Sequence, residues 1–330
     1  MSPPPSGSTT AGGDEAEVRR GTAYGFLAYG IWGAFPIYFA ALAPSGAWEI
    51  LAHRIVWTLV VCALALAVLR DVAWVRPFAR NRRLVLGITA AALVLSLNWV
   101  VYVYAVLTER TYEAALGYFL NPLITIALGV LVLRERLRPL QWAAVGIGLL
   151  AVVVMAVGGG AFPWIAVVLA LSFGTYGLVK KKVGRSLDAL HSLVAETAVM
   201  TPFAVAILTV LLVTGGTTFL GHGGAHTALL VASGVVTAVP LLFFAAAARR
   251  IPLVTIGLLQ FITPVLQLVV GVVVLDETVS TPHWVGFGIV WVALVVLTVD
   301  SLRAARTTRS ERRALEPDEP NVPEVAEPCP

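Results

Sequence analysis

The sequence has little charge, few cysteines and no long polar stretch between its two ends. Of its 330 residues, 13% are charged, whereas soluble domains average about 25%. One of its two cysteines, Cys62, lies in an apolar run and the other, Cys329, near the C-terminus, so we expect no internal disulfide. The five histidines are scattered, and neither an HExxH motif nor a paired-aspartate motif occurs. These absences argue against a water-soluble globular protein and against an enzyme whose active site uses a metal ion or a pair of carboxylates.

Long apolar runs occupy most of the chain instead. The composition is 58% hydrophobic and the mean hydropathy is +0.86. A helix that crosses ~30 Å of hydrocarbon needs ~20 apolar residues, and these runs lack the alternation of barrel strands. The sequence therefore predicts an all-α integral membrane protein. The ten predicted transmembrane helices cover residues 21–42, 47–69, 84–107, 112–133, 140–157, 162–180, 189–213, 227–248, 253–275 and 283–302.

The two ends of the chain differ in composition from the apolar region. Residues 1–18 are rich in Pro, Ser and Gly and lack the basic segment that begins a signal peptide. Residues 303–330 begin with a basic segment and end in a stretch rich in Pro and Glu. Such compositions cannot bury a core, so we expect both segments to be disordered cytosolic tails. Between them we expect two halves of five helices each, residues 19–158 and 159–302.

Positive charge is concentrated on one side of the predicted bundle. Of the 23 Lys and Arg residues, only Arg54 and Arg110 lie elsewhere. Lys and Arg mark the cytoplasmic ends of transmembrane helices. We therefore expect a multi-pass protein of the bacterial inner (plasma) membrane with both termini in the cytoplasm, which requires an even number of helices. The positive segments are residues 19–20, 70–83, 134–138, 180–185, 249–250 and 303–313.

The two halves are related in sequence. Residues 119–147 align without gaps with residues 261–289, and the matches include residue types that an apolar composition does not supply by chance. Each predicted half has an odd number of helices, so the second half enters the membrane from the opposite side. Two inverted repeats with a site near the midplane between them are typical of secondary transporters. The matches include Pro122/Pro264, Glu135/Glu277, Trp142/Trp284 and Gly146/Gly288.

Two charges lie more than one turn inside predicted helices, at equivalent positions of the two halves. Arg54 is a candidate substrate-binding residue, and an interfacial arginine that extends its charge to water explains it equally well. Glu196 is a candidate coupling residue that carries a proton, and a structural hydrogen bond to a helix backbone explains it equally well. Glu49 and His53 share a helix face near Arg54 and are further coupling candidates.

Polar residues beside prolines recur at matching depth in the two halves. A proline removes one backbone hydrogen bond and frees the carbonyl four residues earlier, and paired proline-interrupted helices point to a transporter's binding site. A packing kink is the alternative reading. The candidate substrate-binding residues are Arg54, Asn98, Tyr118, Asn121, Pro122, Thr237, Pro240, Gln260, Thr263 and Pro264.

Several short motifs give the chain a family resemblance between about Arg20 and Leu302. It resembles the RarD branch of the EamA-type proteins in the drug/metabolite transporter superfamily. The resemblance implies a ten-helix inner-membrane carrier that exports small metabolites or drug-like compounds, in a family linked by name to chloramphenicol sensitivity. Phe261 stands where the family often has Tyr, so no hydrogen bond is carried over there. The motifs are EILAHR (49–54), Asn98-Trp99, EAALGYFLNPL (113–123), Glu135-Arg136, SFGTYGLVKKK (172–182), Glu196-Thr197, Thr237 with Pro240-Leu241, and Gln260 with Pro264.

The prediction is a secondary transporter that works by alternating access. Its expected partners are a small-molecule solute and the lipid bilayer. No cofactor, metal or nucleic-acid partner is expected. The prediction allows a homo-oligomer. The alternatives are a membrane-embedded enzyme, which would need a reactive cluster of side chains, and a non-transporting sensor or assembly factor, which would need a sizeable soluble domain.

Overall fold

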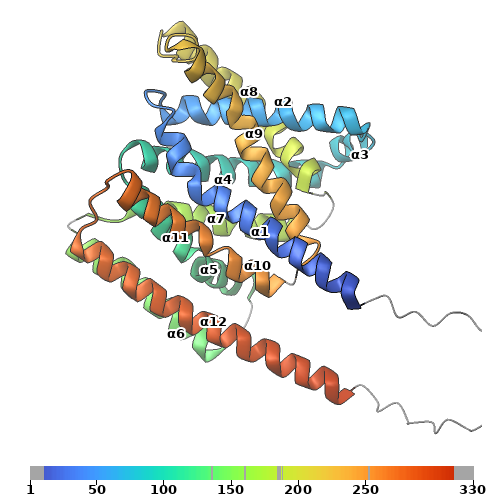
Figure 1. Cartoon of the computed structure of the whole chain (residues 1–330), viewed down its shortest axis with the longest axis vertical. Coiled ribbons are helices and arrows are strands. Elements are labelled where there is room, and N and C mark those ends of the chain that lie inside the picture. The colour runs from blue at the N-terminus through green and yellow to red at the C-terminus, as the bar shows by residue number, and fades with distance from the viewer. Residues whose placement is uncertain are drawn as a thin grey trace, which may run out of the picture.

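A computed structural model of the protein describes residues 11–134, 137–159, 161–183, 187, 189–251 and 253–315. Residues 1–10 and 316–330 of the predicted tails, and Glu135, lie outside this description. All regular structure in the described segments is helical (Figure 1). The elements are α1 (Ala11–Ala40), α2 (Ala47–Leu69), α3 (Val75–Arg80), α4 (Arg82–Leu107), α5 (Thr111–Leu133), α6 (Pro139–Gly158), α7 (Trp164–Val183), α8 (Ala189–Val213), α9 (Gly223–Ala248), α10 (Leu253–Leu259), α11 (Ile262–Val269), the π-helical turn η1 (Val270–Val274) and α12 (Thr281–Leu315).

Seven of the described helices are long and apolar enough to cross a membrane. They include α2, α4, α6 and α9 in full and most of α5, α8 and α12, whereas α7 and the segment from α11 through η1 hold shorter apolar stretches. Large apolar side chains such as Leu64, Leu86 and Val157 are exposed on the outside of the bundle. Contact with lipid tails carries no free-energy cost for such a surface, whereas contact with water does. The fold is thus that of a multi-pass membrane protein.

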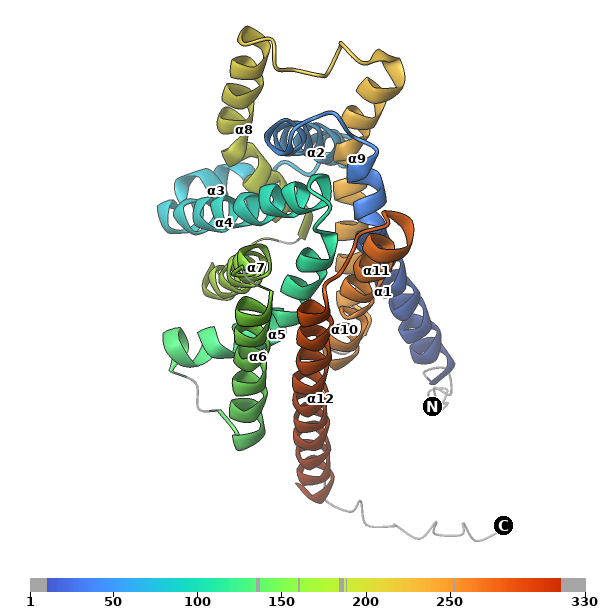
Figure 2. The same ribbon diagram turned by 90° about the vertical axis from the view of Figure 1, so that its left-hand side faces the viewer.

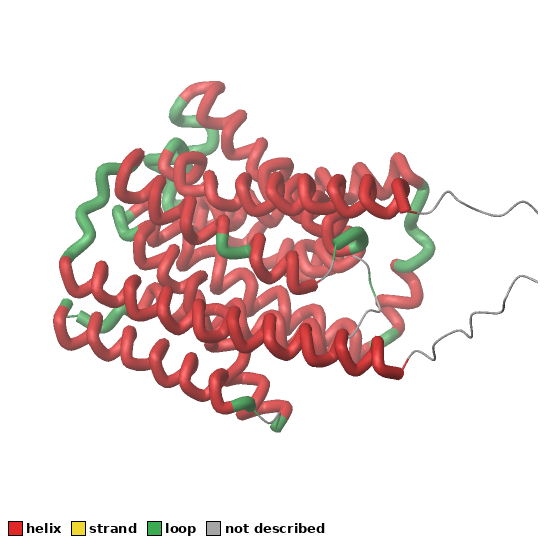
Figure 3. The backbone as a smooth tube through the Cα atoms, turned by 60° about the horizontal axis from the view of Figure 1, so that its bottom comes forward, coloured by secondary structure: helices red, strands yellow, loops and turns green. Residues whose placement is uncertain are grey.

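The long helices run side by side between two ends of the molecule, where most of the loops lie (Figure 3). The start of α1 and the end of α12 lie at the same end (Figures 1 and 2). Both helices continue into segments that we expected to be disordered, residues 11–18 and 303–315. Ala, Glu and Arg are frequent there and favour helix, and each segment extends a helix that the apolar region has already nucleated.

The ninth predicted helix is interrupted rather than continuous. α10 ends at Leu259, and α11 begins at Ile262 with Pro264 in its first turn. A proline is tolerated there because the first N–H groups of a helix have no partner within it. Its first-half counterpart, α5, passes Pro122 without a break. The two prolines therefore have different local effects.

Helices from the two halves interleave. α2 packs against α8 and α9, and α4 packs against α7 and α8. α1 packs against α9 and α11, and α5 packs against α7 and α11. α6 and α12 lie along each other at one edge of the bundle (Figure 1). One hydrophobic core cluster accordingly draws on α1, α2, α4, α5, α7, α8 and α9.

Candidate functional site

Arg54 lies on the side of α2 that faces the other helices. Its side chain is 3% exposed, so it does not extend to the membrane surface as an interfacial arginine would. Arg54 Nε donates a hydrogen bond to Thr237 Oγ1 on α9 over 3.2 Å. The guanidinium carbon lies 4.2 Å from the ring centre of Trp99 and 5.0 Å from that of Phe39, within the range of cation–π attraction. The cation is thus enclosed by aromatic rings from α1 and α4.

Asn98 on α4 is the hub of a second group of polar contacts. The Asn98 side-chain amide donates to Ser172 Oγ over 3.0 Å and to the Leu169 carbonyl over 3.1 Å. Its carbonyl oxygen accepts from the Tyr118 hydroxyl over 3.2 Å. The rings of Tyr118 and Tyr102 are 5.7 Å apart, and the Tyr102 ring lies 5.8 Å from that of Phe39, which contacts the guanidinium. Asn98 therefore joins α4, α5 and α7 beside the buried cation.

Glu196 on α8 is buried and paired. Lys180 Nζ on α7 lies 2.7 Å from Glu196 Oε1. Ser192 donates to the same oxygen over 3.0 Å, and the Tyr176 hydroxyl donates to the other over 3.3 Å. The carboxylate therefore interacts with side chains, not with a helix backbone. Lys180 was read only as part of a basic loop, although its spacing of one helical turn from Tyr176 was a signal for a shared face.

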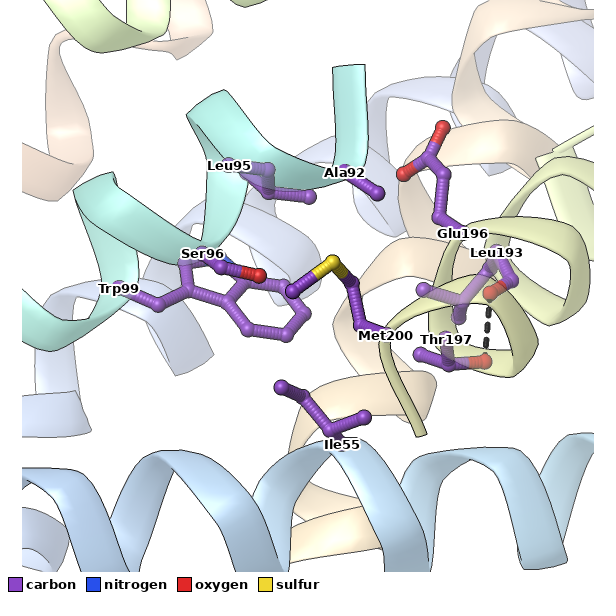
Figure 4. A pocket seen from close by; sticks show the side chains of 9 residues that line it. All are labelled: Ile55, Ala92, Leu95, Ser96, Trp99, Leu193, Glu196, Thr197 and Met200. Atoms are coloured by element: carbon purple, nitrogen blue, oxygen red, sulfur yellow. Dashed lines mark hydrogen bonds between the residues drawn. The ribbon is translucent and has the colours of Figure 1, made fainter. Parts of the chain in front are cut away.

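A small pocket lies between α2, α4 and α8. Figure 4 shows side chains of α4 and α8 facing each other across it, with Ile55 of α2 below. Trp99 lines the pocket and also contacts Arg54, so this ring connects the pocket with the cation. Glu196 is on the opposite wall. The lining residues are Ile55, Ala92, Leu95, Ser96, Trp99, Leu193, Glu196, Thr197 and Met200.

Glu49 and His53 lie in the first two turns of α2, outside this cluster. Glu49 accepts hydrogen bonds from Thr218 N over 2.7 Å and from Thr217 Oγ1 over 2.9 Å. His53 Nδ1 accepts from Trp57 Nε1 over 3.2 Å. The Glu49 carboxylate thus fastens the loop between α8 and α9, and it forms no ion pair with the arginine of its own helix.

The remaining predicted site residues are not all in the central cluster. Thr263 donates to the Tyr29 carbonyl over 2.8 Å and so joins α11 to α1. Gln260, at the break between α10 and α11, is exposed. Pro240 and Pro264 are buried, whereas Asn121 and Pro122 are half-buried in α5. The cluster therefore brings together Arg54, Asn98, Tyr118 and Thr237, with Glu196 on the pocket beside it.

Glu277 has a structural role that the sequence did not reveal beyond its place in the repeat. It is 5% exposed, and its two carboxylate oxygens accept hydrogen bonds from Thr111 N over 2.8 Å and Tyr112 N over 3.0 Å. These are N–H groups at the start of α5, where a helix lacks partners of its own and favours negative charge. Glu277 thus ties the loop before α12 to the start of α5.

Comparison with known proteins identifies the family. The model of the EamA-like transporter family matches residues 19–157 and again residues 163–299. A solved protein crystal structure aligns with a TM-score of 0.56 at 19% sequence identity, covering 86% of this chain and 98% of that one, which shows a shared fold.

Comparison with curated relatives identifies the branch of the family to which the chain belongs. Protein RarD of Streptomyces exfoliatus is 53% identical over 290 residues, which cover 88% of this chain and 91% of the relative. Protein RarD of Escherichia coli is 34% identical, covering 88% and 97%. The chloramphenicol-sensitive protein RarD of Pseudomonas aeruginosa is 31% identical, covering 81% and 90%. The chain therefore belongs to the EamA-like transporter family, in the RarD branch of the drug/metabolite transporter superfamily.

Proposed function

We propose that the chain is a secondary carrier that exports small metabolites or drug-like solutes across the bacterial inner membrane by alternating access. Its family membership makes it a membrane transporter and not an enzyme. The observation that carries the proposal is the hydrogen bond from Arg54 of the first half to Thr237 of the second. It lies beside a pocket that both halves line, which is where carriers with two related halves bind their solutes.

The proposed architecture is two inverted repeats of five transmembrane helices, with both termini in the cytoplasm. Three observations support it. The family model matches once in each half. The contact of α1 with α9 has its counterpart in that of α7 with α4, and the contact of α2 with α9 has its counterpart in that of α8 with α4. The described ends of the chain lie at one end of the bundle, as an even number of crossings requires (Figures 1 and 2).

The proposed substrate site consists of Arg54, Asn98, Tyr118 and Thr237, which the central helices bring together, with the prolines and polar residues of α5, α9 and α11 as further candidates. Glu196 is the proposed coupling residue. It lines the pocket and is paired with Lys180, so loss or gain of a proton at this carboxylate would change a contact between α7 and α8. The relative named for chloramphenicol sensitivity supports a drug-like solute among those carried.

Access to the pocket from each side of the membrane tests the mechanism. In a cysteine-free background (Cys62→Ser with Cys329→Ser), Ser96→Cys places one thiol on the pocket wall. A membrane-impermeant maleimide should label it both in right-side-out and in inside-out vesicles, since a carrier opens its site to each side in turn. A cysteine at the exposed Val75, the first residue of α3, serves as a one-sided control. Labelling of Ser96→Cys from one side only would reject alternating access.

A further inference from the structure

Arg54 is a buried cation with no acidic partner among the described residues. Within them its Nη1 atom has no hydrogen-bond partner, and its Nε donates to Thr237 Oγ1. Removing a charge from water costs several kcal/mol unless a counter-charge and hydrogen bonds replace the lost hydration. Cation–π contacts with Trp99 and Phe39 offset part of this cost. They leave the donor at Nη1 unused.

The carboxylates nearest in sequence or across the pocket are already occupied. Glu49 accepts hydrogen bonds from Thr217 and Thr218. Glu196 is paired with Lys180. In the described part of the chain, no Asp or Glu forms an ion pair with Arg54. The described residues therefore supply no counter-charge to Arg54.

Two further buried donors close to Arg54 are also unused. The Tyr102 hydroxyl has no hydrogen-bond partner among the described residues, and the Tyr102 ring lies 5.8 Å from the ring of Phe39, which contacts the guanidinium. Thr58, one turn further along α2 and fully buried, also has an unpaired hydroxyl. Several free donors around one cation are suited to an acceptor-rich anionic group. The surrounding rings are suited to an apolar or aromatic body.

We propose that Arg54 binds the carboxylate of the transported solute, and that the apolar or aromatic part of the solute packs against the rings of Trp99 and Phe39. The planar guanidinium matches a carboxylate through two parallel hydrogen bonds. Both rings contact the guanidinium, so a group held by Arg54 lies beside them. This inference rests on the proposed transport function, because it names the chemical class of the solute that the central site takes.

Binding to the full-length protein in detergent tests the inference with three probes of one shape and different charge. Benzoate, benzamide and benzamidine carry charges of −1, 0 and +1 on the same ring. Isothermal titration calorimetry should show that benzoate binds at least about tenfold more tightly than either of the others. The ligand should also raise the thermal unfolding midpoint.

Substitutions test which residues bind benzoate. Arg54→Lys, which keeps the charge but loses the planar fork, should weaken benzoate binding about tenfold, and Arg54→Gln should abolish it. Tyr102→Phe removes one free donor with little change in shape and should weaken binding severalfold, which keeps the test valid if Arg54→Gln fails to fold. Arg250→Gln is the matched control, because Arg250 also lies over a ring, Tyr24, but outside the cluster.

Failure of this inference is distinguishable from failure of the proposed function, because binding in detergent requires no transport. Equal affinity for benzoate and benzamide, no binding of benzoate, or unchanged benzoate binding to Arg54→Gln would overturn the carboxylate site. Two-sided labelling of the pocket cysteine would still support a carrier in that case. One-sided labelling together with Arg54-dependent benzoate binding would leave the anion site and reject alternating access.

Discussion

Lys180 and Glu196 form an ion pair that joins α7 to α8, with Nζ 2.7 Å from Oε1. The glutamate side chain is 4% exposed and the lysine side chain 30%, so the acid is buried and the base is partly exposed. Because the acid lines the pocket and the base does not, a change in the charge of Glu196 would be felt at the solute site and at the contact between the helices.

Glu196→Gln tests the proposed coupling role. Glutamine keeps the shape of the side chain and accepts hydrogen bonds from Ser192 and Tyr176, but it carries no charge and binds no proton. We expect transport driven by a pH gradient to be lost and exchange at equal pH to continue. The measurement uses liposomes and a labelled solute that the wild-type protein transports. Lys180→Gln, which removes the ion pair but keeps the carboxylate, should retain gradient-driven transport, and wild-type behaviour of Glu196→Gln in both assays would assign Glu196 a structural role.

Glu277→Gln should destabilise the protein by about 1–2 kcal/mol, because charge-assisted hydrogen bonds at the start of a helix are replaced by weaker neutral ones. The bonds at stake are those to Thr111 N and Tyr112 N. Thermal unfolding in detergent measures the loss. Glu109→Gln is the control, because Glu109 is exposed and its substitution should change the midpoint little. Equal midpoints for the two variants would contradict the assigned role of Glu277.

Gly234→Ala tests the close approach of α9 to α2 beside the cluster. A Cβ atom at residue 234 would lie 2.3 Å from the carbonyl oxygen of Trp57, so the two helices would have to separate. We expect the unfolding free energy to fall by about 1–3 kcal/mol, the usual cost of overpacking, and solute binding to weaken because Arg54 and Thr237 come from these helices. Gly30→Ala is the control, since a Cβ there meets nothing within 4 Å, and it should be neutral or slightly stabilising. Equal effects of the two substitutions would refute the tight contact.

Reporter fusions test the orientation. Because Lys and Arg mark the cytoplasmic side, a fusion after Arg80 should be active in the cytoplasm, and a fusion after Gly221 should be active outside. Alkaline phosphatase and green fluorescent protein, fused in turn at each site, report the two locations. A cytoplasmic signal at Gly221 would contradict both the orientation and the inverted repeats proposed for the two halves.

The apolar segments and the buried charges could be predicted because both follow from composition. An arginine or glutamate in a run of about twenty apolar residues stands out, and Arg54 and Glu196 are indeed buried, at 3% and 4% exposure. Which side of each helix faces the protein interior could not be predicted in the same way. Leu51 is fully buried and Leu64, on the same helix, is 64% exposed. In a membrane both the lipid side and the protein side of a helix are apolar, so periodicity of hydropathy does not separate them.

Contacts between individual side chains of different helices could not be predicted from the sequence for the same reason. Gln260 is four residues before Pro264, yet it is exposed, at the break between α10 and α11. Lys180 belongs to a basic segment of the sequence, yet its side chain pairs with Glu196. Glu49 is on the same helix as Arg54 but accepts hydrogen bonds from Thr217 and Thr218, far along the chain.

The sequence by itself determined the membrane as the solvent of this protein and, through its motifs, its family. The reason is that hydrocarbon requires long apolar helices whose backbone hydrogen bonds are satisfied within each helix. The apolar composition and the length of the segments show that the chain meets this requirement. Only the tertiary structure decided that Arg54 meets Trp99 and Thr237 and lacks an acidic partner among the described residues. Contacts between helices depend on how each helix is rotated against its neighbours, and that rotation is set by packing across the whole bundle.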